Sequence, residues 1–276
     1  MSLFDAFRYD GKRALVVGGA TGMGAATAEL ARDAGAEVVV MDFADVTLSG
    51  VKSIHVNLAD RDSIDRALDE CGGPVNTLFS CAGVADGTPG IEKINFLGHR
   101  HMIDRLLAAG MMPRGSAIGF ISSAAGLGWY QSLAQLLPYL DTPDFDSGAA
   151  WIAANGHADY MWSKQTICAY VARQAYPLLK QGIRINAICP GPTDTPLAQA
   201  NKDLWLGFGS DYRSDLGVEA STPLDQAYPL LFLCSDAAGA VSGITMITDV
   251  GYMSAGMTDA YPAASDAAKF LLGLLG

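Results

Sequence analysis

Tyr160 and Lys164 lie four residues apart in the segment DYMWSK (residues 159–164), which has the residue pattern of a helix. Side chains at positions i and i+4 share one helix face, so the phenol and the ammonium group can point into the same cleft. A free phenol has a pKa of about 10 and is a poor base at neutral pH, but a nearby positive charge lowers that pKa. We therefore expect Tyr160 to exchange a proton with a bound molecule, and Lys164 to lower the pKa of its phenol.

A glycine-rich turn near the N-terminus could bind a phosphate group. Residues 16–42, VVGGATGMGAATAELARDAGAEVVVMD, have the pattern of a strand, a turn, a helix and a second strand. Gly18, Gly22 and Gly24 allow the backbone to turn sharply and to approach a pyrophosphate, whose charge meets the free N–H groups at the start of the helix. The alternative is a turn needed only for close helix packing. The surrounding pattern favours a dinucleotide site.

The acidic residue that ends the second strand indicates which dinucleotide would bind. Asp42 can accept hydrogen bonds from both hydroxyls of an adenosine ribose, and its charge repels a 2′-phosphate. No Lys or Arg lies between Arg32 and Lys52 to neutralise such a phosphate. The sequence therefore predicts NAD rather than NADP as the cofactor.

Short apolar runs alternate with longer amphipathic segments along most of the chain. The runs are apolar throughout, as in parallel strands buried on both faces, and they lie at 13–18, 36–42, 52–57, 76–83, 116–123, 183–191 and 244–251. Helical periodicity occupies the gaps at about 22–34, 60–71, 91–110, 157–181 and 223–236. This alternation predicts an α/β fold, a Rossmann-type doubly wound parallel sheet with helices on both faces. No linker divides the chain, so we expect one domain over residues 1–276.

Three segments depart from the alternation. Only residues 43–50 separate the second and third strands, and a parallel crossover generally needs about a dozen residues, so we expect no helix there. Residues 124–157 and 197–222 fit neither pattern and are predicted to be insertions near the ligand end of the sheet.

Bulk composition excludes several classes of partner. The net charge is −11 and no basic run offsets it, so nucleic acids and anionic membranes are unfavourable partners. The five cysteines are irregularly spaced among apolar neighbours, which is typical of buried thiols in a reducing compartment rather than of disulfides or zinc ligands. The N-terminus does not have the pattern of a signal peptide, and no run approaches the ~18 apolar residues of a membrane span. We expect a soluble cytoplasmic protein without a metal.

Six motifs in order along the chain resemble those of the short-chain dehydrogenase/reductase family. They are the glycine turn ending in GMG, SCAG (80–83), INFLG (94–98), ISSAAG (121–126), YMWSK (160–164) and PGPTDTP (190–196), and the likeness extends from Lys12 to Gly251. The resemblance implies four catalytic positions. Ser123 would bind the substrate oxygen, Tyr160 would exchange its proton, Lys164 would bind the nicotinamide ribose, and Asn95 would hold a water that links Lys164 to solvent.

The resemblance also implies a set of cofactor contacts. Cys81, Ala82 and Gly83 stand where the family has Asn-Ala-Gly, and Asn57 and Leu58 stand where it contacts the adenine. Thr193 and Thr195 would contact the carboxamide and the phosphates. The complete predicted cofactor set is Gly18, Thr21, Gly22, Met23, Gly24, Asp42, Asn57, Leu58, Cys81, Ala82, Gly83, Tyr160, Lys164, Pro190, Gly191, Thr193 and Thr195.

The spacing between Ser123 and Tyr160 is unusually long for the family. These residues are 37 positions apart, which implies an insertion at about 127–155 that is rich in aromatic and leucine side chains. It could be a lid or wall for a bulky apolar substrate, or a contact with a second subunit. The insertion, the short crossover and PGPTDTPL together resemble the 3-alpha-hydroxysteroid dehydrogenase/carbonyl reductase branch.

These features predict an NAD(H)-dependent oxidoreductase that interconverts a secondary alcohol and a ketone on a bulky hydrophobic, cyclic or steroid-like substrate, in a homodimer or homotetramer. One alternative is a protein that senses NAD without turnover. Another is an epimerase or dehydratase that retains its NAD. His99 and His101 are two residues apart, on different helix faces, so we expect them at the surface or at an interface rather than at a metal.

Overall fold

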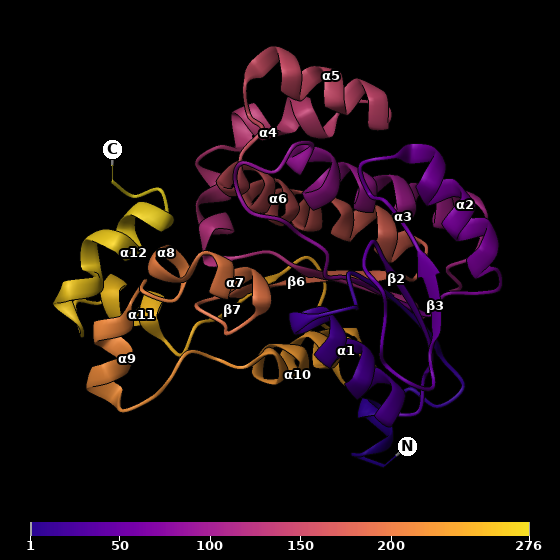
Figure 1. Cartoon of the computed structure of the whole chain (residues 1–276), viewed down its shortest axis with the longest axis horizontal. Helices are drawn as coiled ribbons and strands as arrows, with labels where there is room; N and C mark the ends of the chain where they lie inside the picture. Colours follow the sequence, from indigo (N-terminus) through magenta and orange to yellow (C-terminus); the bar gives the residue numbers. More distant parts are fainter. Residues whose placement is uncertain (1, 276) are drawn as a thin grey trace.

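The computed structural model describes residues 2–275, and its centre is one parallel β-sheet (Figure 1). Seven strands pair in the order β3-β2-β1-β4-β5-β6-β7. They are β1 (Arg13–Val17), β2 (Glu37–Asp42), β3 (Lys52–His55), β4 (Thr77–Ser80), β5 (Ala117–Ile121), β6 (Arg184–Pro190) and β7 (Thr245–Thr248). The order reverses between β1 and β4, and the ends of parallel strands at such a point form a crevice for ligands. The predicted doubly wound sheet is confirmed.

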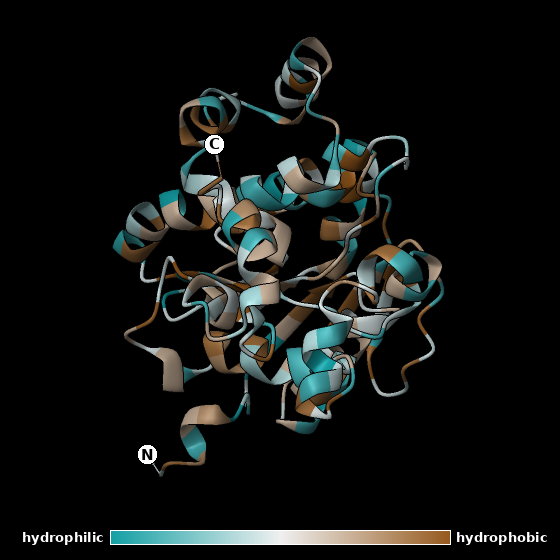
Figure 2. Cartoon of the chain, turned by 90° about the vertical axis from the view of Figure 1, so that its left-hand side faces the viewer, coloured by the Kyte–Doolittle hydropathy of each residue, from teal (hydrophilic) through white to brown (hydrophobic). Residues whose placement is uncertain are grey.

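Two layers of helices cover the sheet. On one face lie α1 (Gly22–Asp33) and α10 (Pro223–Cys234); on the other lie α2 (Arg61–Cys71), α3 (Gly98–Ala108) and α6 (Tyr160–Lys180). As predicted, no helix connects β2 to β3 within the described chain. Figure 2 shows apolar strands in the interior and hydrophilic segments on the outer helices.

Continuous apolar strands are explained by burial on both faces. In β1, Leu15 and Val17 belong to the core cluster beneath α2, α3 and α6, whereas Ala14 and Val16 belong to the cluster beneath α1 and α10. Alternate side chains of a strand point to opposite faces, so a strand with helices on both sides needs apolar residues at every position.

The predicted insertion forms an additional helical layer. The 3₁₀ helix η3 (Ala124–Tyr130) leads into α4 (Leu133–Leu140) and α5 (Phe145–Asn155), which pack on the outer side of α6, α3 and the π-helical turn η2 (Lys93–Leu97). Stacked aromatic rings join the layers: Tyr139 lies 5.2 Å from Trp151, and Trp151 lies 6.1 Å from Trp162 of α6. The insertion therefore packs on its own chain.

The second irregular segment and the C-terminus pack together at one end of the sheet. Residues 197–222 contribute most of the short helices α7 (Pro196–Ala200), α8 (Lys202–Trp205) and α9 (Ser210–Leu216). The Tyr212 ring of α9 packs on the Tyr252 ring of α11 (Tyr252–Met257), and α11 packs on α12 (Ser265–Leu271). The end of the chain is anchored on the insertion, since Tyr130 donates a hydrogen bond to the Leu272 carbonyl at 2.6 Å. No helix among residues 2–275 is long and apolar enough to cross a membrane.

Candidate active site

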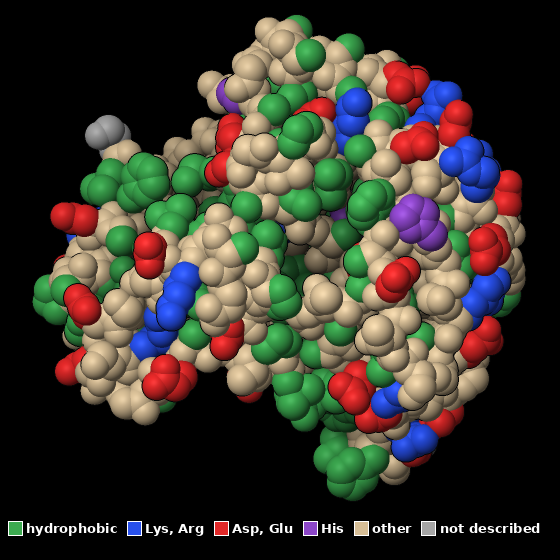
Figure 3. Space-filling model, viewed as in Figure 1, with side chains coloured by type: hydrophobic (Ala, Val, Ile, Leu, Met, Phe, Trp, Pro, Cys, Tyr) green, Lys and Arg blue, Asp and Glu red, His purple; other side chains and the backbone are tan. Residues whose placement is uncertain are grey.

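A cleft of about 530 Å³ lies at the carboxyl ends of the central strands, above the glycine turn. Its volume is within the range of about 300 to 1,000 Å³ that is typical of ligand sites. Figure 3 shows this face of the molecule hollowed near its centre, with charged side chains gathered toward the edge. Most of the predicted cofactor residues line the cleft: Gly18, Thr21, Gly22, Met23, Gly24, Asp42, Asn57, Leu58, Cys81, Ala82, Gly83 and Thr195.

The glycine turn has no room for side chains at two of its positions. A Cβ on Gly24 would lie 1.9 Å from the Gly18 carbonyl oxygen, and one on Gly18 would lie 2.4 Å from Ala82. Gly22 has φ +57°, in the left-handed region that favours glycine. Thr21 precedes α1 without a side-chain cap, which leaves the first N–H groups of this helix free for an anion. The turn therefore fits a pyrophosphate.

Asp42 lies at the other end of the cleft, at the tip of β2. Its carboxylate accepts hydrogen bonds from the backbone N–H groups of Ala20 at 2.8 Å and Ala44 at 2.9 Å. These bonds fix the carboxylate beside the glycine turn and leave lone pairs for a ribose hydroxyl. No Lys or Arg is among the residues that line the described cleft. Phe43, which the sequence analysis did not identify, also lines this end.

The segment after β6 closes the cleft from the opposite side. Thr195 caps α7 and faces the glycine turn, since a Cβ on Gly22 would lie 3.4 Å from its methyl group. Pro190, Gly191 and Thr193 are not among the residues that line the cleft. They form the strand end and turn that place Thr195, and their predicted cofactor contacts remain predictions.

The predicted catalytic side chains Asn95, Ser123, Tyr160 and Lys164 are not among the residues that line the cleft, but Asn95 and Lys164 lie next to Gly83, which does line it. Tyr160 is the first residue of α6, because Asp159 caps the helix by accepting a hydrogen bond from the Trp162 N–H at 2.8 Å. Ser123, which follows β5, lies near the Tyr160 phenol and acts to lower its pKa. Lys164, one turn along α6, lies with its Nζ 5.4 Å from the centre of the Tyr160 ring and donates to the Ile121 carbonyl at 3.0 Å.

The electrostatics of this trio differ from the prediction. Burial raises the pKa of Tyr160 to about 12; the Ser123 hydroxyl acts in the opposite direction, and the negative charge of Asp86 raises the pKa further. The expectation that Lys164 lowers the pKa of Tyr160 is therefore wrong. Burial also lowers the pKa of Lys164 to about 8, so most of these ammonium groups are charged at neutral pH. Removing the phenol from water disfavours its anion more than its neighbours favour it.

Asn95 lies in the π-helical turn η2 and is completely buried. Its side-chain amide accepts a hydrogen bond from the Val84 N–H at 2.8 Å and donates to the Val84 carbonyl at 3.1 Å and to Ser163 Oγ at 3.0 Å. The remaining lone pair of Oδ1 is close to Lys164: a Cβ on Gly83 would lie 3.5 Å from both Asn95 Oδ1 and Lys164 Nζ. A side chain at position 83 would therefore make ordinary van der Waals contact with both groups, and glycine leaves this space open.

Three residues near the site were not identified from the sequence. The Trp205 ring of α8 packs on the Tyr160 ring with 4.9 Å between centroids. Asp86 accepts a hydrogen bond from the Tyr160 N–H at 2.6 Å. His99, expected at the surface or at an interface, is buried in the core, because its face of α3 points toward the sheet. Its Nε2 lies 3.1 Å from the Ala82 carbonyl, and burial lowers its pKa to about 4. The spacing of four between Asn95 and His99 could have indicated a shared face.

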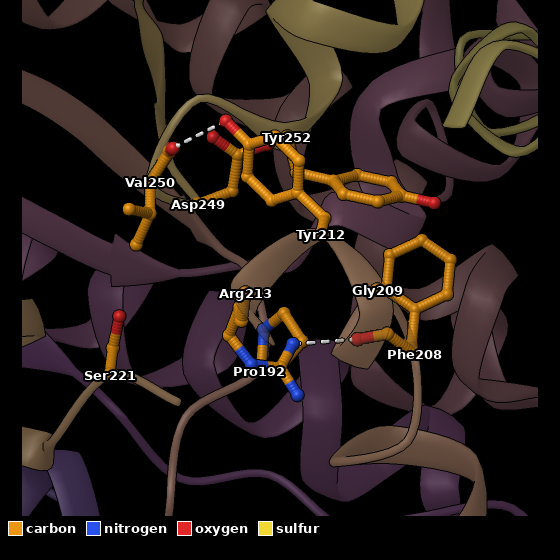
Figure 4. A pocket seen from close by; sticks show the side chains of 9 residues that line it. All are labelled: Pro192, Phe208, Gly209, Tyr212, Arg213, Ser221, Asp249, Val250 and Tyr252. Carbon is orange, nitrogen blue, oxygen red and sulfur yellow. Dashed lines mark hydrogen bonds between the residues drawn. The ribbon is translucent and has the colours of Figure 1, made fainter. Parts of the chain in front are cut away.

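A second cavity, beneath α9, is only about 10 Å³ (Figure 4). A single water needs about 10 to 15 Å³, so this space is a packing gap and not a substrate site. Hydrogen bonds around it anchor α9: Tyr212 donates to the Val250 carbonyl at 3.1 Å, and Arg213 donates to the Phe208 carbonyl at 2.8 Å. These contacts fix the far end of the segment that carries Trp205.

Comparisons with known proteins agree with this geometry. A family model described as Enoyl-(Acyl carrier protein) reductase matches residues 145–253. Tropinone reductase-like 1 of Erythroxylum coca is 31% identical over 264 residues, which cover 89% of this chain and 91% of that protein. The 3-alpha-hydroxysteroid dehydrogenase/carbonyl reductase of Comamonas testosteroni is 27% identical, over 86% of this chain and 95% of its own.

The crystal structure of a 3-alpha-hydroxysteroid dehydrogenase from Pseudomonas sp. B-0831, complexed with NADH, has the same fold. It superposes with a TM-score of 0.68 and 24% identity over 91% of this chain and 99% of that chain. The fold, the motifs and a relative more than 30% identical over nearly the full length agree. The chain therefore belongs to the short-chain dehydrogenase/reductase family, and it is an oxidoreductase of the kind that uses a nicotinamide dinucleotide.

Proposed function

We propose that this protein is an NAD(H)-dependent oxidoreductase that interconverts a secondary alcohol and a ketone on a bulky hydrophobic, cyclic substrate. One observation carries the proposal: Ser123 and Lys164 flank the Tyr160 phenol, and Lys164 lies next to Gly83, which lines a cleft that suits a dinucleotide.

The bound nicotinamide would accept or supply the hydride. Ser123 would hold the substrate oxygen, and Tyr160 would take the hydroxyl proton during oxidation or return it during reduction. Lys164 would bind the nicotinamide ribose. Because Asn95 Oδ1 and Lys164 Nζ flank the same space, a water between them would carry the proton onward.

Asp42 supports NAD as the cofactor. Its carboxylate is fixed at the ribose end of the cleft, and the lining residues there provide no Lys or Arg for a 2′-phosphate. The choice of NAD over NADP is thus proposed on charge alone.

Trp205 supports a hydrophobic cyclic substrate. Its ring packs on the Tyr160 ring, so a substrate at the phenol would lie beside the indole. The two ends of the segment that carries Trp205 are joined by a backbone hydrogen bond, in which the Asp194 N–H donates to the Ser221 carbonyl at 2.8 Å. A fixed aromatic wall of this kind favours flat or cyclic carbon skeletons. The wall is thus proposed to come from 197–222, with α4 and α5 forming an outer layer.

The Trp205→Ala variant tests the substrate class. We expect KM for a cyclic ketone to rise about tenfold, the equivalent of about 1.4 kcal/mol, while KM for a small acyclic ketone changes little. Leu204→Ala is the matched control, since Leu204 is adjacent on α8 and 73% exposed. Equal effects on both ketones would contradict the assignment of Trp205.

The Tyr160→Phe variant tests the reaction itself. Only the proton donor is removed, so turnover should be lost while NADH affinity, measured by fluorescence, stays nearly unchanged. Tyr228→Phe, at an exposed tyrosine of α10, is the control. A protein that only senses NAD would bind cofactor and oxidise no alcohol in a panel. An epimerase or dehydratase would retain NAD through purification and need none added.

We further propose that one domain, residues 1–276, works in a homodimer or homotetramer in a reducing, cytoplasmic compartment. The side chains of Ile244, Ile247 and Val250 on and beside the edge strand β7 are exposed, which suits a contact with a second copy. The five cysteines are free thiols, which suits a reducing compartment.

A further inference from the structure

We propose that Asp86 is a positioning residue, which ties the inner wall of the cofactor cleft to the first residue of the catalytic helix and places a negative charge near Tyr160. The inference rests on the function proposed above and adds a residue to its machinery.

The loop that carries Asp86 is a wall of the cleft. Val84, Thr88 and Pro89 line the cleft, and the side chain of Asn95 holds both the N–H and the carbonyl of Val84. Within this loop, a turn from Ala85 to Thr88 places Asp86 at its corner. The position of Asp86 is therefore coupled to the part of the chain that would contact the nicotinamide end of the cofactor.

Asp86 also contacts the backbone of the catalytic residue Tyr160. Asp86 Oδ1 accepts a hydrogen bond from the Tyr160 N–H at 2.6 Å, across 74 residues of sequence. Asp159 already caps α6 through the Trp162 N–H, so the helix has its local cap without Asp86. The Asp86 carboxylate therefore links the loop that lines the cleft to the start of α6, which carries the phenol of Tyr160. A charge-assisted hydrogen bond to a backbone N–H is short and directional, as this one is.

Asp86 also acts on the phenol electrostatically. Its negative charge disfavours the phenolate and contributes to the raised pKa of Tyr160. The other titratable groups near the phenol, or on the elements that pack against it, are His157, Asp159, Lys164, Cys189, Lys202 and Asp203. In alcohol oxidation Tyr160 must be deprotonated, so the rate rises with pH through its pKa. Removing the Asp86 charge should move that rise to lower pH.

Two variants separate the hydrogen bond between Asp86 and the Tyr160 N–H from the negative charge of Asp86. Asp86→Asn keeps an acceptor oxygen and removes the charge, whereas Asp86→Ala removes both. For Asp86→Asn we expect the rise of kcat/KM for alcohol oxidation to shift down by about half a pH unit, which is about a threefold higher rate below the pKa. For Asp86→Ala we expect kcat to fall about tenfold, because the phenol is no longer held in place. Asp266→Asn, at an exposed carboxylate of α12, is the control for loss of charge.

A readout that needs no activity tests the tie directly. In protein labelled with ¹⁵N-tyrosine, the Tyr160 amide is assigned by its disappearance in Tyr160→Phe. It should remain protected from hydrogen exchange in Asp86→Asn and lose protection in Asp86→Ala. NADH should bind about threefold more weakly to Asp86→Ala only, the order of one weak hydrogen bond.

The outcomes distinguish this inference from the proposed function. Unchanged amide protection in Asp86→Ala overturns the tie, and an unshifted pH profile in Asp86→Asn overturns the electrostatic role. If the wild type oxidises no alcohol, the proposed function fails, whereas the amide exchange and NADH affinity still decide the tie. If Asp86 only caps the helix, Asp86→Asn should have the amide protection and the pH profile of kcat/KM of the wild type. That result would overturn the inference of a charge effect.

Discussion

Replacing Asp42 by Asn should change the cofactor preference while leaving the fold of the cleft nearly intact. Asp42 accepts one hydrogen bond on each carboxylate oxygen, from Ala20 and from Ala44. The amide of Asn keeps one acceptor, so one backbone N–H loses its partner at a cost of about 1 kcal/mol. This cost applies to NAD and NADP alike. The lost charge relieves the repulsion of the phosphorylated cofactor, and it weakens the hydrogen bonds from the ribose hydroxyls of NAD.

The magnitude follows from charge and exposure. Two unit charges about 4 Å apart interact by about 1 kcal/mol in water and by about 4 kcal/mol near a protein surface. Asp42 is half-buried and the 2′-phosphate carries nearly two charges, so we expect a repulsion of about 2 to 3 kcal/mol. Since 1.4 kcal/mol is a factor of ten, the ratio of NAD to NADP affinity should fall by about 30- to 100-fold in Asp42→Asn.

The assay is a titration of NADH and NADPH into wild type and variant, followed by the ratio of kcat/KM for the two cofactors. Asp45→Asn, an exposed carboxylate on the same short crossover, is the matched control. The preference should also weaken in the wild type at high salt, because salt screens partly exposed charges. If Asp42→Asn lowers both affinities equally and leaves their ratio unchanged, charge at this position does not select the cofactor, and the reasoning from Asp42 is refuted.

Two further predictions concern residues around the cleft. Gly24→Ala should abolish NADH binding, because its Cβ would lie 1.9 Å from the Gly18 carbonyl, whereas Gly239→Ala makes only a 3.4 Å contact and should bind normally in the same titration. His99 has a pKa of about 4 in the folded protein and 6.5 when unfolded, so the unfolded chain binds more protons between these values. Stability should therefore be full above about pH 6.5 and fall by about 3 kcal/mol as the pH drops to about 4. Denaturant unfolding at several pH values should show a flatter slope in His99→Phe than in wild type or in the exposed-site control His55→Phe; equal slopes in all three would contradict the assignment.

Much of the fold could be predicted because burial on both faces leaves a strong pattern in the strands. The run ALVV in β1 and the run VVVM in β2 are apolar at every position for this reason. The absence of a helix between β2 and β3 followed from chain length alone. The packing of α4 and α5 could not be predicted, because an apolar helix can cover its own chain or a neighbouring one.

The predicted site divides in the same way. Gly18, Gly24 and Asp42 were identifiable because backbone geometry and charge restrict the residue type at each position. Asp86 and Trp205 act through contacts across 74 and 45 residues, between loops whose patterns carry no signal of their partners. The direction of the Tyr160 pKa was missed because spacing reveals a nearby cation but not the loss of water around the phenol.

The outer helical layer has a consequence for how this enzyme could be trimmed or redesigned. Trp162 and Phe96 contact Trp151 and Tyr139 of the insertion across aromatic faces that are now shielded. Excising residues 131–156 would uncover these rings together with the neighbouring Tyr170. The shortened protein would then expose an aromatic patch that promotes aggregation. These residues would need polar replacements or a partner surface that covers them.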